Sequence, residues 1–257
     1  MMEKIKKLRG ITGAGIVDCK SALSEAEGDI DKAVDYLRKK GAIKAAKKAD
    51  RETNEGLTAI AMSDDNKKAS IIKIYCETDF VARNEDFINF VKDIAERGLS
   101  ESAEEYFNGK KEEMILKIGE NITFGESKII EGEYLASYIH SNKKVASVVS
   151  FNKTIDEATA KDIAMQVVAM NPSFISPDEV PESEKEKEKE IYREQLLKQG
   201  KPENIIDNIL IGKINKYCEE ICLLKQPFIK DDKKIVEQIL KEADVDAKIV
   251  KFIKCEL

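Results

Sequence analysis

Residues 1–40 carry apolar side chains at helical spacing in three short segments. Residues 2–9 and 16–26 predict two helices, and the glycines between them permit a turn with positive φ. Residues 30–37 predict a third helix, for which Asp29 is a suitable N-cap. Three helices of this size predict a compact helical bundle.

The pattern then changes to β-branched and alternating apolar positions. Residues 57–63 and 69–76 predict two strands, joined by a polar turn at 64–68. Asn84 is placed to cap a helix, and a further helix runs through residues 114–118. The apolar face of the first of these helices consists of Phe87, Phe90, Val91 and Ile94. Helices mixed with antiparallel strands predict an α+β fold.

A faint internal repeat crosses this region. Gly56 and the Asn-Lys-Lys triplet at 66–68 recur, with the same separation, as Gly132 and the triplet at 142–144. Apolar strand residues flank each triplet, so the repeat predicts two similarly built core subdomains, each a hairpin with a helix. We place the first subdomain at residues 56–131 and the second at residues 132–181 and 223–257.

Residues 182–222 interrupt the second subdomain. The alternation of Glu and Lys at 182–190 is typical of a solvated helix face. Gly200-Lys201-Pro202 favours one helix end followed by one helix start, and a second apolar stripe continues to Ile221. We therefore predict an inserted antiparallel helical hairpin. After it, a helix near 235–243 and a strand near 248–255 complete the core.

Charge narrows the class of partner. The chain has a net charge of −6, whereas a generic polyanion binder is basic overall. This balance favours a protein partner and argues against direct nucleic-acid binding. Residues 38–51 are a local exception, with seven basic residues and one acid. We interpret 41–55 as a basic linker; RNA contact is the alternative, although no aromatic residue is interleaved for stacking.

Neither a membrane segment nor a metal site is expected. No apolar run approaches the roughly 18 residues of a membrane span, and residues 1–9 lack an apolar signal core, so we expect a cytoplasmic protein. The five cysteines are odd in number and scattered, which argues against a disulfide framework. Cys218 and Cys222 lie one helical turn apart, but the chain has one histidine, so reduced thiols are the favoured interpretation and no cofactor is expected.

Motifs for covalent chemistry are missing. Gly10 and Gly15 have the glycine spacing of a P-loop, but Ile16 occupies the lysine position. His140 stands alone in a predicted hairpin, and no nucleophile elbow or zinc-protease motif occurs. These observations favour a binding protein over an enzyme.

The connection at residues 76–84 is unusual because it carries Phe80 shortly before the predicted N-cap, Asn84. One interpretation is a hydrophobic staple, in which Phe80 packs on its own helix near Ile88 or fills the core. The other is an exposed ring that enters a pocket of a partner. The residue pattern leaves both open.

The segment Thr78-Asp79-Phe80-Val81-Ala82 resembles the most diagnostic motif of the elongation factor Ts family. The stretch at 8–23 resembles that family's opening motif. Further segments continue the match in the right order along nearly the whole chain: 28–29, 41–48, 117–122, 163–167 and 226–228. The bundle at 1–40 resembles a ubiquitin-associated domain.

This resemblance implies a guanine-nucleotide exchange factor for elongation factor Tu. It implies that Thr78, Asp79, Phe80 and Val81 disturb the Mg²⁺ and phosphate site of that partner. It also implies that Ile16, Val17 and Gln166 dock on it, and that residues 182–222 support a homodimer. Many members carry a further C-terminal helix, so we expect that contact to be missing. The alternative function is an RNA-binding accessory factor of the translation apparatus.

Overall fold

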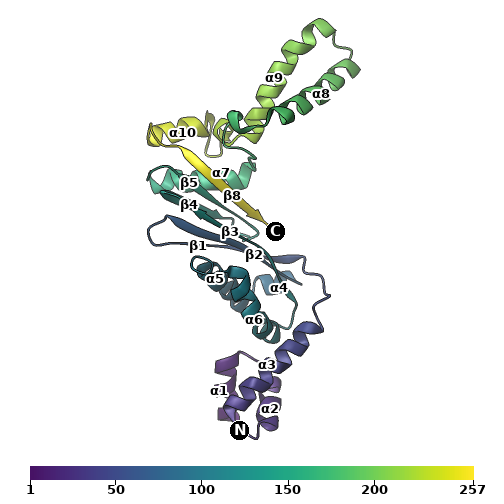
Figure 1. Ribbon diagram of the computed structural model, residues 1–257, viewed down its shortest axis with the longest axis vertical. Helices are drawn as coiled ribbons and strands as arrows, with labels where there is room; N and C mark the ends of the chain where they lie inside the picture. Colours follow the sequence, from purple (N-terminus) through teal and green to yellow (C-terminus); the bar gives the residue numbers. More distant parts are fainter.

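The computed structural model describes residues 1–257 and has an α+β architecture. The molecule is elongated (Figure 1). A bundle of three helices lies at one end, two small antiparallel sheets with their helices lie in the middle, and a pair of helices projects from the other end. The two ends of the molecule are therefore far apart.

The three predicted N-terminal helices are α1 (Met2–Thr12), α2 (Ile16–Glu25) and α3 (Ile30–Ala46). Asp29 caps α3 as predicted, because its side chain accepts a hydrogen bond from the backbone N–H of Lys32 at 3.0 Å. Helix α3 continues without a break past residue 40, so the first part of the predicted linker belongs to this helix.

The first sheet has the order β1-β2-β3, with β1 (Glu55–Met62), β2 (Lys68–Cys76) and β3 (Ile122–Glu131) all antiparallel. Helices α5 (Glu85–Arg97) and α6 (Ala103–Ile118) pack against it and bury one apolar cluster. Asn84 caps α5 as predicted, accepting from the Asp86 N–H at 2.8 Å. Strand β3 was not predicted.

The second sheet has the order β4-β5-β8, with β4 (Tyr134–Ile139), β5 (Val145–Phe151) and β8 (Ile249–Glu256). Its apolar face is covered by α7 (Glu157–Met170) and α10 (Val236–Ala243). The remaining short elements of this half are η1 (Pro177–Glu179), η2 (Leu223–Lys225), β6 (Pro227–Phe228) and β7 (Asp231–Ile235).

The internal repeat has a structural counterpart that is shifted by one residue. Asn66 and Lys143 hold equivalent turn positions, with φ of 55° and 56°. The two turns also bond reciprocally across the sheets: the Leu135 N–H donates to the Asn66 carbonyl at 2.8 Å, and the Thr58 N–H donates to the Lys143 carbonyl at 2.7 Å. The sequence repeat paired Asn66 with Asn142, and its second glycine lies outside a strand. The two hairpins therefore face each other with approximate two-fold symmetry.

Helices α8 (Glu182–Lys198) and α9 (Glu203–Ile221) form the projecting pair (Figure 1). They pack on each other through Leu196, Ile206 and Leu210, which are buried. Gly200 adopts a positive φ of 73° in the connection between them. Several large apolar side chains of this pair stay exposed: Ile191, Leu197, Ile205 and Ile211.

An exposed glycine and a buried glycine are expected to have opposite effects on stability when replaced by alanine. A Cβ at Gly109 in α6 would meet nothing within 4 Å, so Gly109→Ala should raise the free energy of unfolding by about 0.5–1 kcal/mol. A Cβ at Gly56 would lie 2.2 Å from the Ile74 carbonyl oxygen, so Gly56→Ala should lower it by about 2–3 kcal/mol. Urea unfolding measures both; equal effects would contradict this packing.

Candidate partner-binding surface

The predicted connection at 76–84 forms a short helix, α4 (Asp79–Ala82), between β2 and α5. Thr78 is its N-cap, and the Thr78 hydroxyl accepts from the Val81 N–H at 3.4 Å. Val81 and Ala82 are buried in the apolar cluster of the first sheet. These two side chains attach α4 to the core.

Phe80 points away from the core, and its exposed fraction is 82%. Successive helix residues project about 100° apart, so a helix that buries Val81 and Ala82 turns the preceding side chain outward. The staple interpretation is therefore wrong, since Ile88 packs against the core cluster and Phe80 does not. An aromatic ring this exposed on an anchored turn is typical of a contact with another molecule.

Asp79 lies beside the ring and forms an ion pair with Arg83 at 3.0 Å. The Arg83 side chain is 81% exposed, so solvent screens this pair and it contributes little to stability. Asp79 can therefore break its ion pair with Arg83 and bind a charged or polar group of a partner with little loss of stability.

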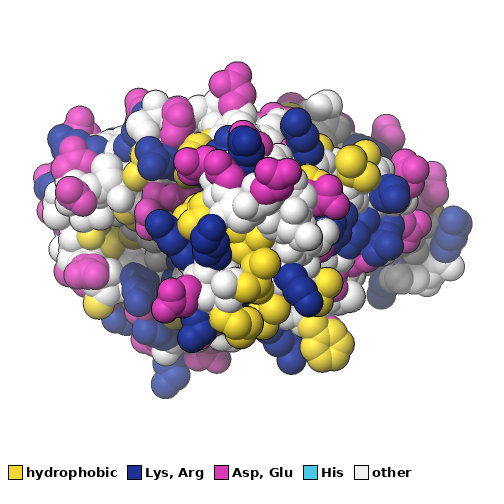
Figure 2. Space-filling view, turned by 90° about the horizontal axis from the view of Figure 1, so that it is seen from below, with side chains coloured by type: hydrophobic (Ala, Val, Ile, Leu, Met, Phe, Trp, Pro, Cys, Tyr) yellow, Lys and Arg dark blue, Asp and Glu magenta, His cyan; other side chains and the backbone are white.

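A second apolar surface lies on the bundle, at the first turn of α2. Ile16 is 54% exposed and Val17 is 80% exposed, whereas Cys19 on the same helix is buried. Seen from the bundle end, hydrophobic side chains form a band flanked by Lys and Arg (Figure 2). The predicted docking residues Ile16 and Val17 are therefore available at the surface.

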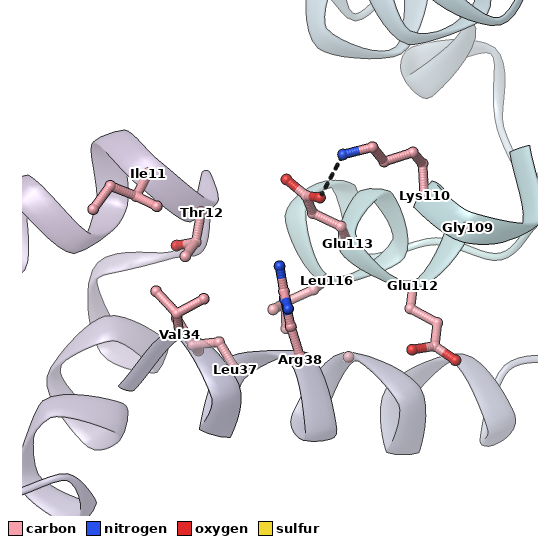
Figure 3. Close-up of a pocket in the computed structure, with 11 residues that line it drawn as sticks. Ile11, Thr12, Val34, Leu37, Arg38, Gly109, Lys110, Glu112, Glu113 and Leu116 are labelled. Atoms are coloured by element: carbon pink, nitrogen blue, oxygen red, sulfur yellow. Dashed lines mark ion pairs between the residues drawn. The ribbon is translucent and has the colours of Figure 1, made fainter. Parts of the chain in front are cut away.

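The bundle is attached to the first sheet through α6. Leu116 belongs to the buried cluster of the bundle, and Gly41 of α3 lies so close to α6 that a Cβ would be 3.1 Å from the Glu112 carbonyl oxygen. A cavity of about 550 Å³ remains at this joint, with the apolar Val34 and Leu37 on one side and α6 on the other (Figure 3). Helices α3 and α6 therefore pack closely at this joint, but a cavity remains between the bundle and α6.

Lys117 links the two apolar surfaces. Its side chain packs against Gly13 in the turn that precedes Ile16, and its Nζ pairs with Asp86 of α5 at 2.7 Å. Asp86 lies in the first turn of α5, four residues after α4 ends at Ala82. Phe80 and the start of α2 are thus carried by one connected set of contacts.

Four of the seven basic residues of 38–51 form contacts within the molecule. Lys40 and Lys44 both pair with Asp18, at 2.9 and 3.0 Å. Burial alone would raise the pKa of Asp18, but the hydrogen bonds from these two lysines hold it below its usual value. Lys48 donates to the Gly119 carbonyl, and Arg51 lies 3.4 Å from Glu77. These pairings weaken the RNA-contact interpretation.

Gln166 requires a correction. Its side chain is completely buried; Nε2 donates to the Gln226 side-chain oxygen at 3.3 Å and to the Pro227 carbonyl at 3.0 Å, and Oε1 accepts from the Ile229 N–H at 2.9 Å. A side chain with all these bonds inside the core does not fit the predicted contact with a partner. Its role in this structure is to hold the turn at 226–229.

The cysteines are free and buried. Burial raises the pKa of Cys76 to about 12 and the pKa values of Cys222 and Cys255 to about 11, so these thiols stay protonated and unreactive at neutral pH. No group of three His, Cys, Asp or Glu side chains is placed to hold a metal ion. None of the helices combines the length and apolarity needed to cross a membrane.

Comparison with known proteins gives a consistent result. The family model described as Elongation factor TS matches residues 77–257, which include the α4 segment. A protein named Elongation factor Ts from Aquifex aeolicus is 41% identical over 100% of this chain and 97% of its own length. One of the same name from Nitratidesulfovibrio vulgaris is 44% identical over 93% of this chain and 87% of its own. One from Clostridium perfringens is 41% identical over 98% and 91%.

Proposed function

This chain belongs to the elongation factor Ts family of translation elongation factors, and we propose that it binds elongation factor Tu·GDP and promotes release of the GDP. In this proposal the protein is an exchange factor, and no bond is made or broken on it. The observation that carries the proposal is Phe80, an 82% exposed ring on a short helix that is attached to the core by the buried Val81 and Ala82.

We further propose a modular organisation. Residues 1–46, up to the end of α3, form a bundle of the ubiquitin-associated type, and the remaining residues up to 55 form the linker. Residues 56–131 form one core subdomain, and 132–181 with 223–257 form the other. The helical hairpin at 182–222 is the insertion. The reciprocal bonds between Asn66, Leu135, Thr58 and Lys143 support two related core subdomains.

The action of Phe80 follows from the chemistry of Mg²⁺. A GTPase holds GDP through backbone N–H groups around the phosphates and through Mg²⁺, which demands nearly ideal octahedral geometry. A ring that enters the surroundings of the ion makes that geometry costly to keep. Phe80 is the apolar wedge, Asp79 is its polar neighbour, and Thr78 and Val81 hold the helix that carries it.

Burial of Phe80 in the complex can supply enough free energy to weaken GDP binding. Burying one Phe side chain supplies roughly 1.5–3 kcal/mol, and each 1.4 kcal/mol changes an equilibrium about tenfold. A larger effect draws on the rest of the interface, including Ile16 and Val17. Linkage makes the effect reciprocal: if the factor weakens GDP binding, GDP weakens binding of the factor by the same ratio. Entry of GTP then displaces the factor and completes the cycle.

Substoichiometric protein should accelerate GDP release from purified elongation factor Tu. A fluorescent GDP analogue is preloaded on Tu, and its dissociation is followed with the chain at one hundredth of the Tu concentration and with excess GTP. Turnover of many Tu molecules by each molecule of the chain is the expected result. A release rate equal to that of Tu alone would reject the exchange function.

Self-association through the α8–α9 pair is a separate prediction. Ile211 is 63% exposed, and Ile205, Ile191 and Leu197 are also exposed, so a second copy would bury apolar surface. Ile211→Glu should weaken any dimer by about tenfold or more in sedimentation equilibrium. GDP release should be unchanged, because α4 lies in another part of the molecule (Figure 1). An unchanged dimer dissociation constant would show that this face of the α8–α9 pair is not the dimer interface.

A further inference from the structure

The start of α4 is held by a residue distant in sequence. The Thr78 N–H donates to one carboxylate oxygen of Glu120 at 3.0 Å, and the Thr78 hydroxyl donates to the other at 2.7 Å. The same hydroxyl accepts from the Val81 N–H. One half-buried carboxylate thus fixes both polar groups of the residue from which α4 begins.

The turn that carries Glu120 is itself braced on both sides. On one side, Lys48 donates to the Gly119 carbonyl. On the other, the Asn121 N–H donates to a Glu77 carboxylate oxygen at 2.6 Å, and the buried Asn121 amide donates to the Arg51 carbonyl at 2.9 Å. Glu120 therefore has a fixed backbone from which to hold Thr78.

A helix as short as α4 has no stability of its own, so its orientation depends on what holds its ends. Val81 and Ala82 fix the end that faces the core. At the other end, the residue preceding Asp79 and Phe80 is held by the paired bonds to Glu120 and by a 3.2 Å contact from the Cys76 thiol to its carbonyl. The paired bonds are charge-assisted, and hence the stronger of these contacts.

We propose that Glu120 is a positioning residue for nucleotide exchange: by binding Thr78 through both carboxylate oxygens, it sets the direction in which Phe80 projects toward the GTPase. This inference rests on the proposed exchange function. Glu120 acts through Thr78 and Phe80 and is not required to contact the partner.

The role predicts a specific kinetic signature. Glu120→Ala should lower the maximal rate of GDP release at saturating factor by about tenfold, because a displaced contact group loses much of its effect. The half-saturating concentration should change less than about twofold, since docking residues such as Ile16 are untouched. Glu120→Gln keeps one acceptor and one donor for Thr78, so it should restore most of the rate.

A double-mutant cycle separates positioning from general damage. If Glu120 acts through the ring, Glu120→Ala should have no further effect in a Phe80→Ala background. Additive losses would overturn the proposal. Glu131→Ala, which removes an exposed carboxylate paired with Lys68 at 3.2 Å, is the matched control and should retain the wild-type rate and melting temperature.

Hydrogen exchange tests the positioning without the partner. In the free protein, the hydrogen-bonded amides of Thr78 and of 81–83 should exchange at least about fivefold faster in Glu120→Ala than in the wild type. The amides of β1 should keep their protection. Unchanged protection at Thr78 and 81–83 would overturn the inference, whatever the release assay shows. Wild-type protein that fails to release GDP would reject the proposed function alone.

Discussion

Replacing Phe80 with alanine is expected to slow the maximal rate of GDP release from elongation factor Tu by tenfold or more. The ring is 82% exposed in the free chain, so its apolar surface is available to a partner and contributes little to the fold. Losing roughly 1.5–3 kcal/mol of burial in the complex corresponds to about a ten- to hundredfold change. Stopped-flow release of a fluorescent GDP analogue at saturating factor measures it.

The melting temperature should stay within about 1 °C of the wild type, because no core contact is removed. Phe80→Leu, which keeps an apolar side chain, should retain part of the rate. Val245→Ala shortens another exposed apolar side chain, 77% exposed near the second sheet, and serves as the control. A folded Phe80→Ala protein with the wild-type maximal rate would show that the ring is not the wedge.

The second large effect is expected at the bundle. Changing Ile16 and Val17 together to aspartate should raise the half-saturating concentration of factor by about tenfold or more, because two apolar contacts are replaced by charges that must be desolvated. The maximal release rate should stay near the wild-type value, since α4 is unaltered. Titration of the factor in the release assay gives both parameters.

The fold should tolerate this change. Both positions are exposed and lie in the first turn of α2, where acidic side chains interact favourably with the helix N-terminus. Met2→Asp is the control, since it adds one negative charge, half of the change in the double variant, at the first turn of α1 at a position that is 66% exposed. An equal loss of affinity in the control would mean that net charge, and not this surface, is being measured.

Much of the fold could be predicted because local signals agreed with the tertiary structure. Asp29 and Asn84 cap helices as their side chains predict, and residues 57–63 and 69–76 pair as a hairpin. Strand β3 could not be recognised: only Ile122 and Ile130 are buried, and charged residues interrupt its pattern. The pairing with β2 that makes it a strand is a tertiary contact.

The site was predictable only in part. The connection at residues 76–84 stands out in the sequence because it carries Phe80 ahead of the predicted N-cap Asn84, but that pattern fits both a staple and an exposed ring. The burial of Val81 and Ala82, which only the structure shows, decides that the Phe80 side chain points outward. Gln166 was expected at the surface but is buried. Its burial depends on a bond to Gln226, which is distant in the sequence.

Glu120 had no local signal for a role at the site. It lies in one of the segments that resemble the family, but nothing in the chain around it indicates a bond to Thr78, which is 42 positions away. A contact between a turn after α6 and the start of α4 depends on how the helices pack on the first sheet. A positioning residue of this kind is recognised from the three-dimensional structure, because the sequence pattern around it carries no signal.

We propose that docking and displacement of the nucleotide reside in separate parts of one connected structure. This proposal is tested most directly by the dependence of the GDP release rate on factor concentration, recorded for the wild type, for Phe80→Ala and for the Ile16/Val17 variant. We expect a lower plateau with little change in half-saturation for Phe80→Ala, and a shifted half-saturation with an unchanged plateau for the bundle variant. If both variants change the same parameter, or if Phe80→Ala reaches the wild-type plateau, docking and displacement are not divided between the bundle and Phe80.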